Sequence, residues 1–131
     1  MKTDVDIRQD LLAYIKASAI KDAISGQVRI IPRSSQSDAE DCIISVLDSD
    51  SEQVQDAFVN VNVYVPNIVS GGESVENVSR TKLIATVCSE VLRDFYVGGD
   101  WYHLAKQRIL PVNGKDEYVI NNKIKCRINN E

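Results

Sequence analysis

The chain has 131 residues, 44% hydrophobic and 26% charged, which fits one globular domain and excludes disorder throughout. Its formal net charge of −4 argues against a general nucleic-acid binder, because such proteins usually present a strongly basic face. No apolar run approaches the roughly 20 residues that span a bilayer, and the N-terminal residues MKTDVDIRQD lack the apolar stretch of a signal peptide, so we expect a cytosolic protein without membrane contacts.

The N-terminal region is expected to be helical over residues 4–17. Ile7, Leu11 and Ile15 recur every four residues, which places them on one apolar stripe of a helix. The pattern fades near Gly26, and glycine is a natural helix stop.

Three strands are expected next, over residues 27–31, 42–47 and 58–65. Pro32 ends the first strand because it has no amide hydrogen for a ladder, and the polar residues 48–51 form a turn after the second. The third strand alternates most clearly, so one face is expected in the core and the other in water or in an interface. These two faces are Val59, Val61, Val63 and Val65 against Phe58, Asn60, Asn62 and Tyr64.

A long loop at residues 67–79 leads to a second helix over about residues 75–96. Two strands over residues 101–110 and 118–128 complete the chain, and Asn113-Gly114 between them is a strong hairpin signal. The second helix carries a broad apolar stripe at helical spacing, formed by Leu83, Ile84, Val87, Cys88, Val91, Leu92 and Phe95.

This order of elements predicts an α+β fold. We expect a single domain over residues 1–131, with an antiparallel sheet of about five strands and two helices packed on one of its faces.

No combination of residues in the sequence amounts to an active site, and we expect no catalytic, cofactor-binding or metal-binding residue. His103 is the only histidine and has no Asp, Glu or Cys partner at a metal-ligand spacing. Cys42, Cys88 and Cys126 are widely spaced and form no CxxC pair, which argues against a zinc ribbon or a thioredoxin motif and indicates free thiols in a reducing compartment.

Two segments resemble ligand-binding loops but lack the required residues. A calcium loop that begins at Asp48 needs glycine where Gln53 stands and a bidentate glutamate where Val59 stands. Residues 69–73 contain glycines but lack the lysine and hydroxyl of a phosphate-binding loop. We expect an acidic turn and a mobile loop at these places.

Charge is segregated along the chain. Residues 38–56 contain no Lys or Arg and hold the carboxylates of Asp38, Glu40, Asp41, Asp48, Asp50, Glu52 and Asp56. The C-terminal region instead holds Lys106, Arg108, Lys115, Lys123, Lys125 and Arg127. Either these are two solvated faces, or the acidic edge of one copy meets the basic edge of a neighbour.

The basic last strand is a candidate for phosphate contacts. Simple alternation puts Tyr102 on the same face as Lys106 and Arg108, and it is the nearest aromatic residue to these cations. Because the basic face of the last strand has no aromatic platform of its own, stacking on single-stranded nucleic acid has little support, and no specific nucleic-acid binding is expected.

The order of elements resembles the tail-completion and tail-terminator proteins of long-tailed bacteriophages, in which an N-terminal helix, antiparallel strands, a long helix and a closing hairpin follow one another. The alternating strand FVNVNVYV, the loop and then the amphipathic helix RTKLIATVCSEVLRDF carry this resemblance. It implies a non-catalytic homo-oligomeric ring, commonly a hexamer, at the head-proximal end of the tail tube, where it contacts other tail or head-connector proteins. The loop at residues 67–79 is then expected to become ordered when a neighbour binds.

Two alternatives stay open from the residues alone. One is a small bacterial protein- or ligand-binding module that uses the face of Asn60, Asn62 and Tyr64. The other is a small enzyme, such as a nuclease, that holds a divalent metal at Asp48 and Asp50 of the acidic segment.

Overall fold

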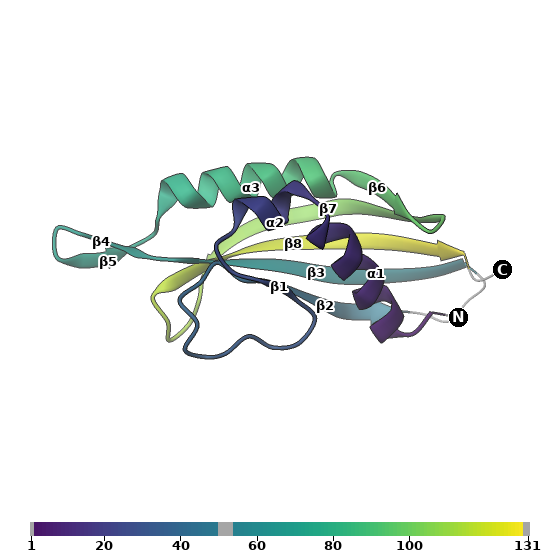
Figure 1. Ribbon diagram of the computed structural model, residues 1–131, viewed down its shortest axis with the longest axis horizontal. Helices are drawn as coiled ribbons and strands as arrows, with labels where there is room; N and C mark the ends of the chain where they lie inside the picture. Colours follow the sequence, from purple (N-terminus) through teal and green to yellow (C-terminus); the bar gives the residue numbers. More distant parts are fainter. Residues whose placement is uncertain (1, 50–53, 130–131) are drawn as a thin grey trace.

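A computed structural model of the chain describes residues 2–49 and 54–129. Within these residues a curled six-stranded sheet has the strand order β1-β2-β3-β8-β7-β6, and a separate two-stranded hairpin projects from it (Figure 1). The elements in chain order are α1 (Asp4–Lys16), α2 (Ala19–Ala23), β1 (Val28–Arg29), β2 (Cys42–Ser49), β3 (Val54–Pro66), β4 (Ile68–Ser70), β5 (Glu73–Val75), α3 (Val78–Leu92), β6 (Asp94–Val97), β7 (Asp100–Pro111) and β8 (Glu117–Asn129).

The α+β class is confirmed, but the predicted antiparallel sheet of five strands with two helices is wrong in three respects. Within the described residues the sheet has six strands and there are three helices. The sheet is mixed, because β1 pairs with β2 in parallel while the other neighbours in the sheet are antiparallel. The parallel pair arises because residues 30–41 carry the chain back along the sheet before β2 begins.

The predicted N-terminal helix is present as α1, and a short helix that was not predicted, α2, follows it. Thr3 and Asp6 form a capping box at the start of α1, which satisfies amides that have no partner inside the helix. Ser18 then starts α2: its hydroxyl donates to the Ile15 carbonyl and accepts from the Ile20 amide. The predicted stripe of Ile7, Leu11 and Ile15 is completely buried.

The second long helix ends at Leu92, four residues earlier than predicted, and the chain continues as β6. The cause is the turn at Gly98 and Gly99, whose φ angles of 59° and 90° suit a two-residue hairpin between β6 and β7. Phe95 is therefore buried from a strand, where its ring stacks between Tyr14 and Tyr102 at centroid distances of 4.0 and 5.1 Å.

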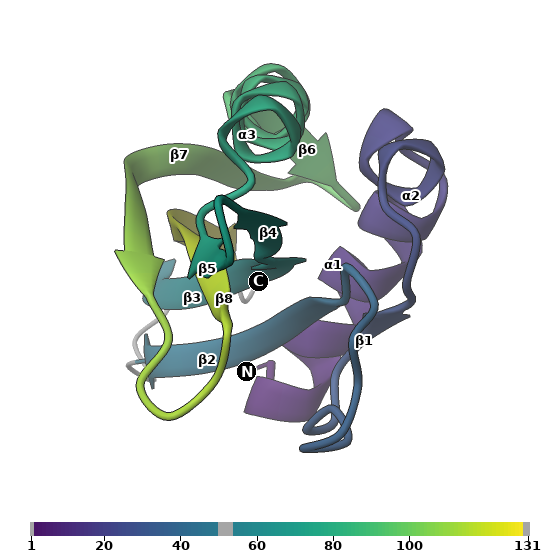
Figure 2. The ribbon, with the colours of Figure 1, turned by 90° about the vertical axis from the view of Figure 1, so that its left-hand side faces the viewer.

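Helices and sheet share one apolar core on the inner face of the curl (Figure 2). The valine face of β3 is buried as predicted. On β8 the buried side chains of the same face are Ile120, Asn122, Ile124, Cys126 and Ile128. Leu83 is the clear error in the predicted stripe of α3: it is 47% exposed, while Thr81 and Ala85 are buried instead.

A β-bulge changes the faces of β7. The register with β8 shifts between Leu104 and Lys106, so Ala105 is an extra residue and the alternation reverses after it. Tyr102 consequently lies in the core with no exposed surface, and the prediction that it shares a face with Lys106 and Arg108 is wrong.

The same bulge turns Gln107 inward. Its side-chain amide donates to the Ala85 carbonyl at 3.1 Å and to the Asn122 side-chain oxygen at 2.8 Å. Asn122 is fully buried on the face of β8 that also carries Ile120 and Ile124, and its side-chain amide donates to the Val61 carbonyl. A polar pair inside the core thus has its hydrogen bonds satisfied.

Two predicted loops contain strand. β2 continues to Ser49 through residues that were expected to begin a turn, while residues 50 and 51 lie outside the described part of the chain. The loop predicted at residues 67–79 forms the β4–β5 hairpin and the first residues of α3.

We expect Phe95→Ala to lower the free energy of unfolding by about 3–5 kcal/mol, because it removes a buried aromatic ring and leaves a cavity. Urea denaturation measures this loss. The neighbouring Tyr96 is 68% exposed, so Tyr96→Ala is the matched control and should change stability by no more than about 0.5 kcal/mol. Equal losses at both positions would contradict the alternation that defines β6.

Candidate interaction surfaces

The face of the sheet away from the helices is rich in cations. We name it the basic sheet face, formed by Lys106 and Arg108 on β7 and Lys123, Lys125 and Arg127 on β8. Lys106 is directly opposite Lys123 in the β7–β8 register, and like charges in such a pair are destabilising. Among the described residues, Arg127 pairs with Asp56 at 3.1 Å, and no carboxylate lies within ion-pair distance of the other four cations.

Aromatic and amide side chains lie beside these cations. The ammonium groups of Lys123 and Lys125 are 4.8 and 6.0 Å from the centre of the Phe58 ring. The Asn121 amide donates to the side-chain oxygens of Asn60 and Asn62 at 3.0 and 2.7 Å. The prediction that Tyr102 is the aromatic residue nearest to these cations is therefore wrong, because Phe58 reaches Lys123 and Lys125 across the β3–β8 ladder.

The acidic segment at residues 38–56 is partly used inside the molecule. The Glu40 carboxylate is buried and receives two hydrogen bonds from Arg80, at 2.9 and 2.6 Å. Asp41 is buried as well and accepts hydrogen bonds from Arg33 and Ser37. Within the described residues, Asp38 and Asp48 are the exposed carboxylates of this segment that form no ion pair.

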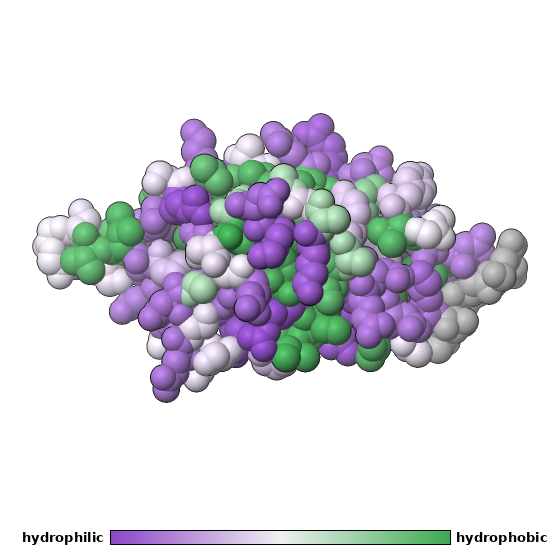
Figure 3. Space-filling model, in the orientation of Figure 1, coloured by the Kyte–Doolittle hydropathy of each residue, from purple (hydrophilic) through white to green (hydrophobic). Residues whose placement is uncertain are grey.

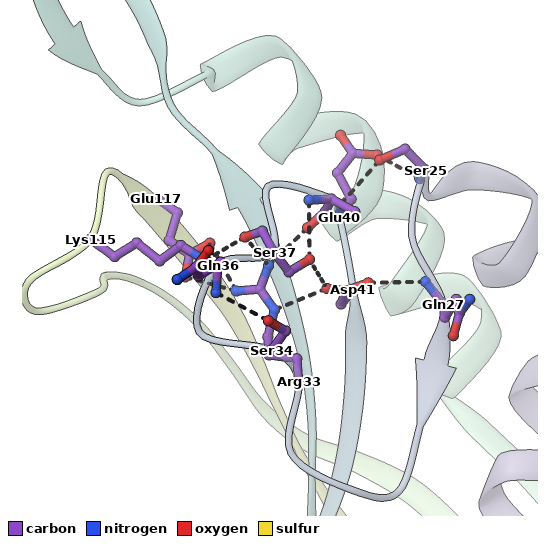
Figure 4. A network of polar contacts seen from close by, with 11 residues as sticks. Ser25, Gln27, Arg33, Ser34, Gln36, Ser37, Glu40, Asp41, Lys115 and Glu117 are labelled. Carbon is purple, nitrogen blue, oxygen red and sulfur yellow. Dashed lines mark hydrogen bonds and ion pairs between the residues drawn. The ribbon is translucent and has the colours of Figure 1, made fainter.

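Arg33 organises a buried polar cluster that joins the segment at residues 30–41 to β8 (Figure 4). Its guanidinium donates to Asp41 at 3.0 Å and to both Glu117 oxygens at 2.8 and 2.9 Å. Further hydrogen bonds reach the carbonyls of Ser37 and Ala39. The side chain is only 10% exposed, so it can remain charged there because each side of the guanidinium meets a partner.

The hydrogen bonds of this cluster also change the ionisation of its acids. Burial opposes ionisation of Asp41, but hydrogen bonds from Ser37, the Gln27 amide and Arg33 outweigh burial and lower the pKa of the carboxyl. Burial likewise opposes ionisation of Glu40, and contacts with Arg80 and Ser25 lower its pKa overall.

The residues considered for catalysis are not brought together. His103 pairs with Lys125 in the β7–β8 register and stacks on Trp101 with ring centroids 4.5 Å apart, outside the core. Cys88 and Cys126 lie inside the core, and burial raises the pKa of the Cys88 thiol to about 12. Asp48 is exposed on β2, while Asp50 lies outside the described residues. No group of three or more potential metal ligands occurs among the residues that the structure describes.

The β4–β5 hairpin, which we name the arm (residues 67–76), projects beyond the helices and the large sheet (Figure 1). Its two strands pair only with each other within the described residues. Ile68 is 45% exposed and Val69 78% exposed, and Figure 3 shows apolar surface at this projecting end. Its root is fixed by the Asn67 amide, which donates to the Asp116 carbonyl at 3.0 Å.

An apolar groove lies along β2, where residues of α1 and of the segment at residues 30–33 also line it. Its larger hollow has a volume of about 400 Å³ and is lined chiefly by apolar residues, namely Ile30, Ile31, Pro32, Ile43, Ile44 and Tyr64, together with Arg8, Arg33 and Ser45. A second hollow of about 260 Å³, lined by Asp4, Arg8, Ser45 and Val46, shares Arg8 and Ser45 with the first. Because β1 pairs only with Cys42 and Ile43, no described strand pairs with the rest of β2 on this side.

No protein-family model matches the chain, and no curated protein matches it. Among solved structures the chain is similar to one in the virion of a native gene transfer agent particle. The TM-score is 0.56, the sequence identity is 12%, and the match covers 92% of each chain. At this identity the likeness shows a shared fold over almost the whole chain. No helix in the described residues is long and apolar enough to cross a membrane.

We expect Arg33→Met to lower the free energy of unfolding by about 3–5 kcal/mol, because the carboxylates of Asp41 and Glu117 remain buried without their cation. Chemical denaturation at neutral pH measures the change. Arg108→Met is the control, since Arg108 is exposed and forms no ion pair with a described residue, and it should alter stability by no more than about 0.5 kcal/mol. A small effect at Arg33 would contradict the proposed role of the cluster in holding the segment.

Acid should weaken the fold through Glu40 and Asp41. Their pKa values are lowered by folding, so their contribution to stability is present above the unfolded pKa values of about 4.3 and 3.9 and is lost as the pH falls toward the lower folded values. Urea midpoints measured from pH 7 down to pH 3 should fall most steeply below about pH 5. An Asp41→Asn variant should start less stable and show a flatter acid limb, and an unchanged limb would contradict this assignment.

Proposed function

We propose that the chain is a non-catalytic structural component of a phage-like particle, in which it completes or terminates the tail as part of a homo-oligomeric ring. The observation that supports this most is the fold likeness to a virion chain over 92% of both chains. The order of elements supports the same role independently, through the resemblance to tail-completion proteins. In this role the protein acts in the virion tail after its synthesis in the bacterial host.

Ring assembly requires two unlike and complementary patches on each subunit. The basic sheet face supplies one patch, since four of its cations have no described carboxylate partner. Asp38 and Asp48 supply exposed carboxylates of the acidic segment, while Glu40 and Asp41 are committed to partners inside the chain. Contacts of this kind also suit the docking of other tail or head-connector proteins, because charge complementarity steers association and selects partners.

The direct test is the solution mass, measured by light scattering on a sizing column over a range of protein concentration. A discrete multimer, increasing with concentration, is the expected result. A protein that stays monomeric at the highest soluble concentration would contradict self-assembly into a ring.

Charge reversal tests whether the basic sheet face takes part in self-assembly. The double variant Lys123→Glu, Lys125→Glu should weaken the multimer, because it places carboxylates where an acidic partner docks. Lys16→Glu with Lys21→Glu is the matched control, since both lysines are exposed on the helical side of the molecule. Added salt should weaken the unmodified multimer in the same way by screening the charges. An unchanged mass in the Lys123, Lys125 variant would remove the charge-pairing contact.

A further inference from the structure

We propose that the groove along β2 binds the arm of a second copy of this chain, so that an arm strand extends the large sheet across the subunit boundary. This contact rests on the self-assembly proposed above and names the surfaces that form it. Strand addition at a free sheet edge combines main-chain hydrogen bonds with pockets for alternate side chains.

The arm has the properties of a segment that is completed by a partner. Each of its strands has three residues, and an isolated two-stranded hairpin is at best marginally stable in water. Val69, at 78%, is the most exposed of the large hydrophobic residues described, and Ile68 beside it is 45% exposed. Exposed apolar side chains on a projecting element gain stability when a neighbour buries them.

The groove has the properties of the receiving surface. Ile31, which lines it, is 55% exposed, and Ile43 and Ile44 of β2 line it as well. Along residues 44–46 of β2, no described strand pairs with the edge on this side. An unpaired edge next to an apolar hollow is the arrangement that an added strand requires.

Charge favours the same pairing. Glu73 and Glu76 lie at the tip side and the root of the arm, and Arg8 lines both hollows of the groove. Arg8 donates to the Ile30 carbonyl at 3.0 Å and forms no ion pair with a described carboxylate, so its charge remains available to the arm. Asp4 lies beside Arg8 in the smaller hollow and repels the carboxylates of the arm. The arm is therefore expected to dock at the larger hollow.

The arm must come from another chain. Figure 1 shows it projecting from one end of the molecule, away from β1 and β2, and its root is held by Asn67. Arm and groove are different surfaces, so the contact repeats from copy to copy and closes into a ring where the rotation permits. Reciprocal exchange between two copies closes a dimer instead, and the solution mass distinguishes these assemblies.

Cysteine pairing tests the contact directly, because Cys42, Cys88 and Cys126 are buried and leave the surface free of native thiols among the described residues. Val69→Cys protein is mixed with a size-tagged Ile31→Cys protein, and the mixture is oxidised and, in parallel, treated with a short bismaleimide linker. We expect a covalent heterodimer of tagged and untagged chains. Leu83→Cys, on α3 and 47% exposed, replaces Ile31→Cys in the matched control. Linkage to Leu83→Cys that equals linkage to Ile31→Cys, or no linkage to either, overturns the proposal.

A second measurement separates this inference from the proposed function. The double variant Ile68→Ser, Val69→Ser should weaken self-association on the order of tenfold, whereas Leu83→Ser should not. A multimer that is unchanged in the arm variant overturns the arm contact and leaves ring assembly standing. A monomeric unmodified protein, without cross-links, contradicts both.

Discussion

The long antiparallel pairing of β3 with β8 is the constraint on which the other elements depend. Each strand is 13 residues long, and they pair from Val54 with Asn129 to Pro66 with Glu117. Side chains alternate between faces with a period of two, so this one register sends the valines of β3 and the isoleucines of β8 to the same side. That apolar face needs a cover, which α1, α2 and α3 provide. The opposite face is left to cations, amides and Phe58.

Two local features then decide which surfaces remain for partners. The bulge at Ala105 reverses the faces of β7, and as a result Lys106 and Arg108 join the cations of β8. Arg33 holds the segment at residues 30–41 against β8 and thereby shapes one side of the groove along β2. In a chain whose net charge is −4, five cations thus lie together on one face, while Glu40 and Asp41 are buried in ion pairs.

These surfaces suit a protein that acts by contact. The basic sheet face is charged, whereas the arm and the groove are largely apolar and unlike one another. A subunit with two dissimilar apolar surfaces can bind its copies in one direction, and the charged face can steer the same association.

Features that depend on neighbouring residues could be predicted from the sequence: the α+β class, the buried stripe of α1, the valine face of β3 and the closing hairpin. Contacts between distant parts of the chain were needed to establish that residues 94–97 form a strand, that β1 runs parallel to β2 and that Tyr102 is buried. The same holds for Glu40 and Asp41, which the charge pattern assigned to an exposed acidic edge and which instead neutralise Arg80 and Arg33. Alternation and helical periodicity are local, but a bulge, an ion pair and a sheet edge depend on which distant residues meet.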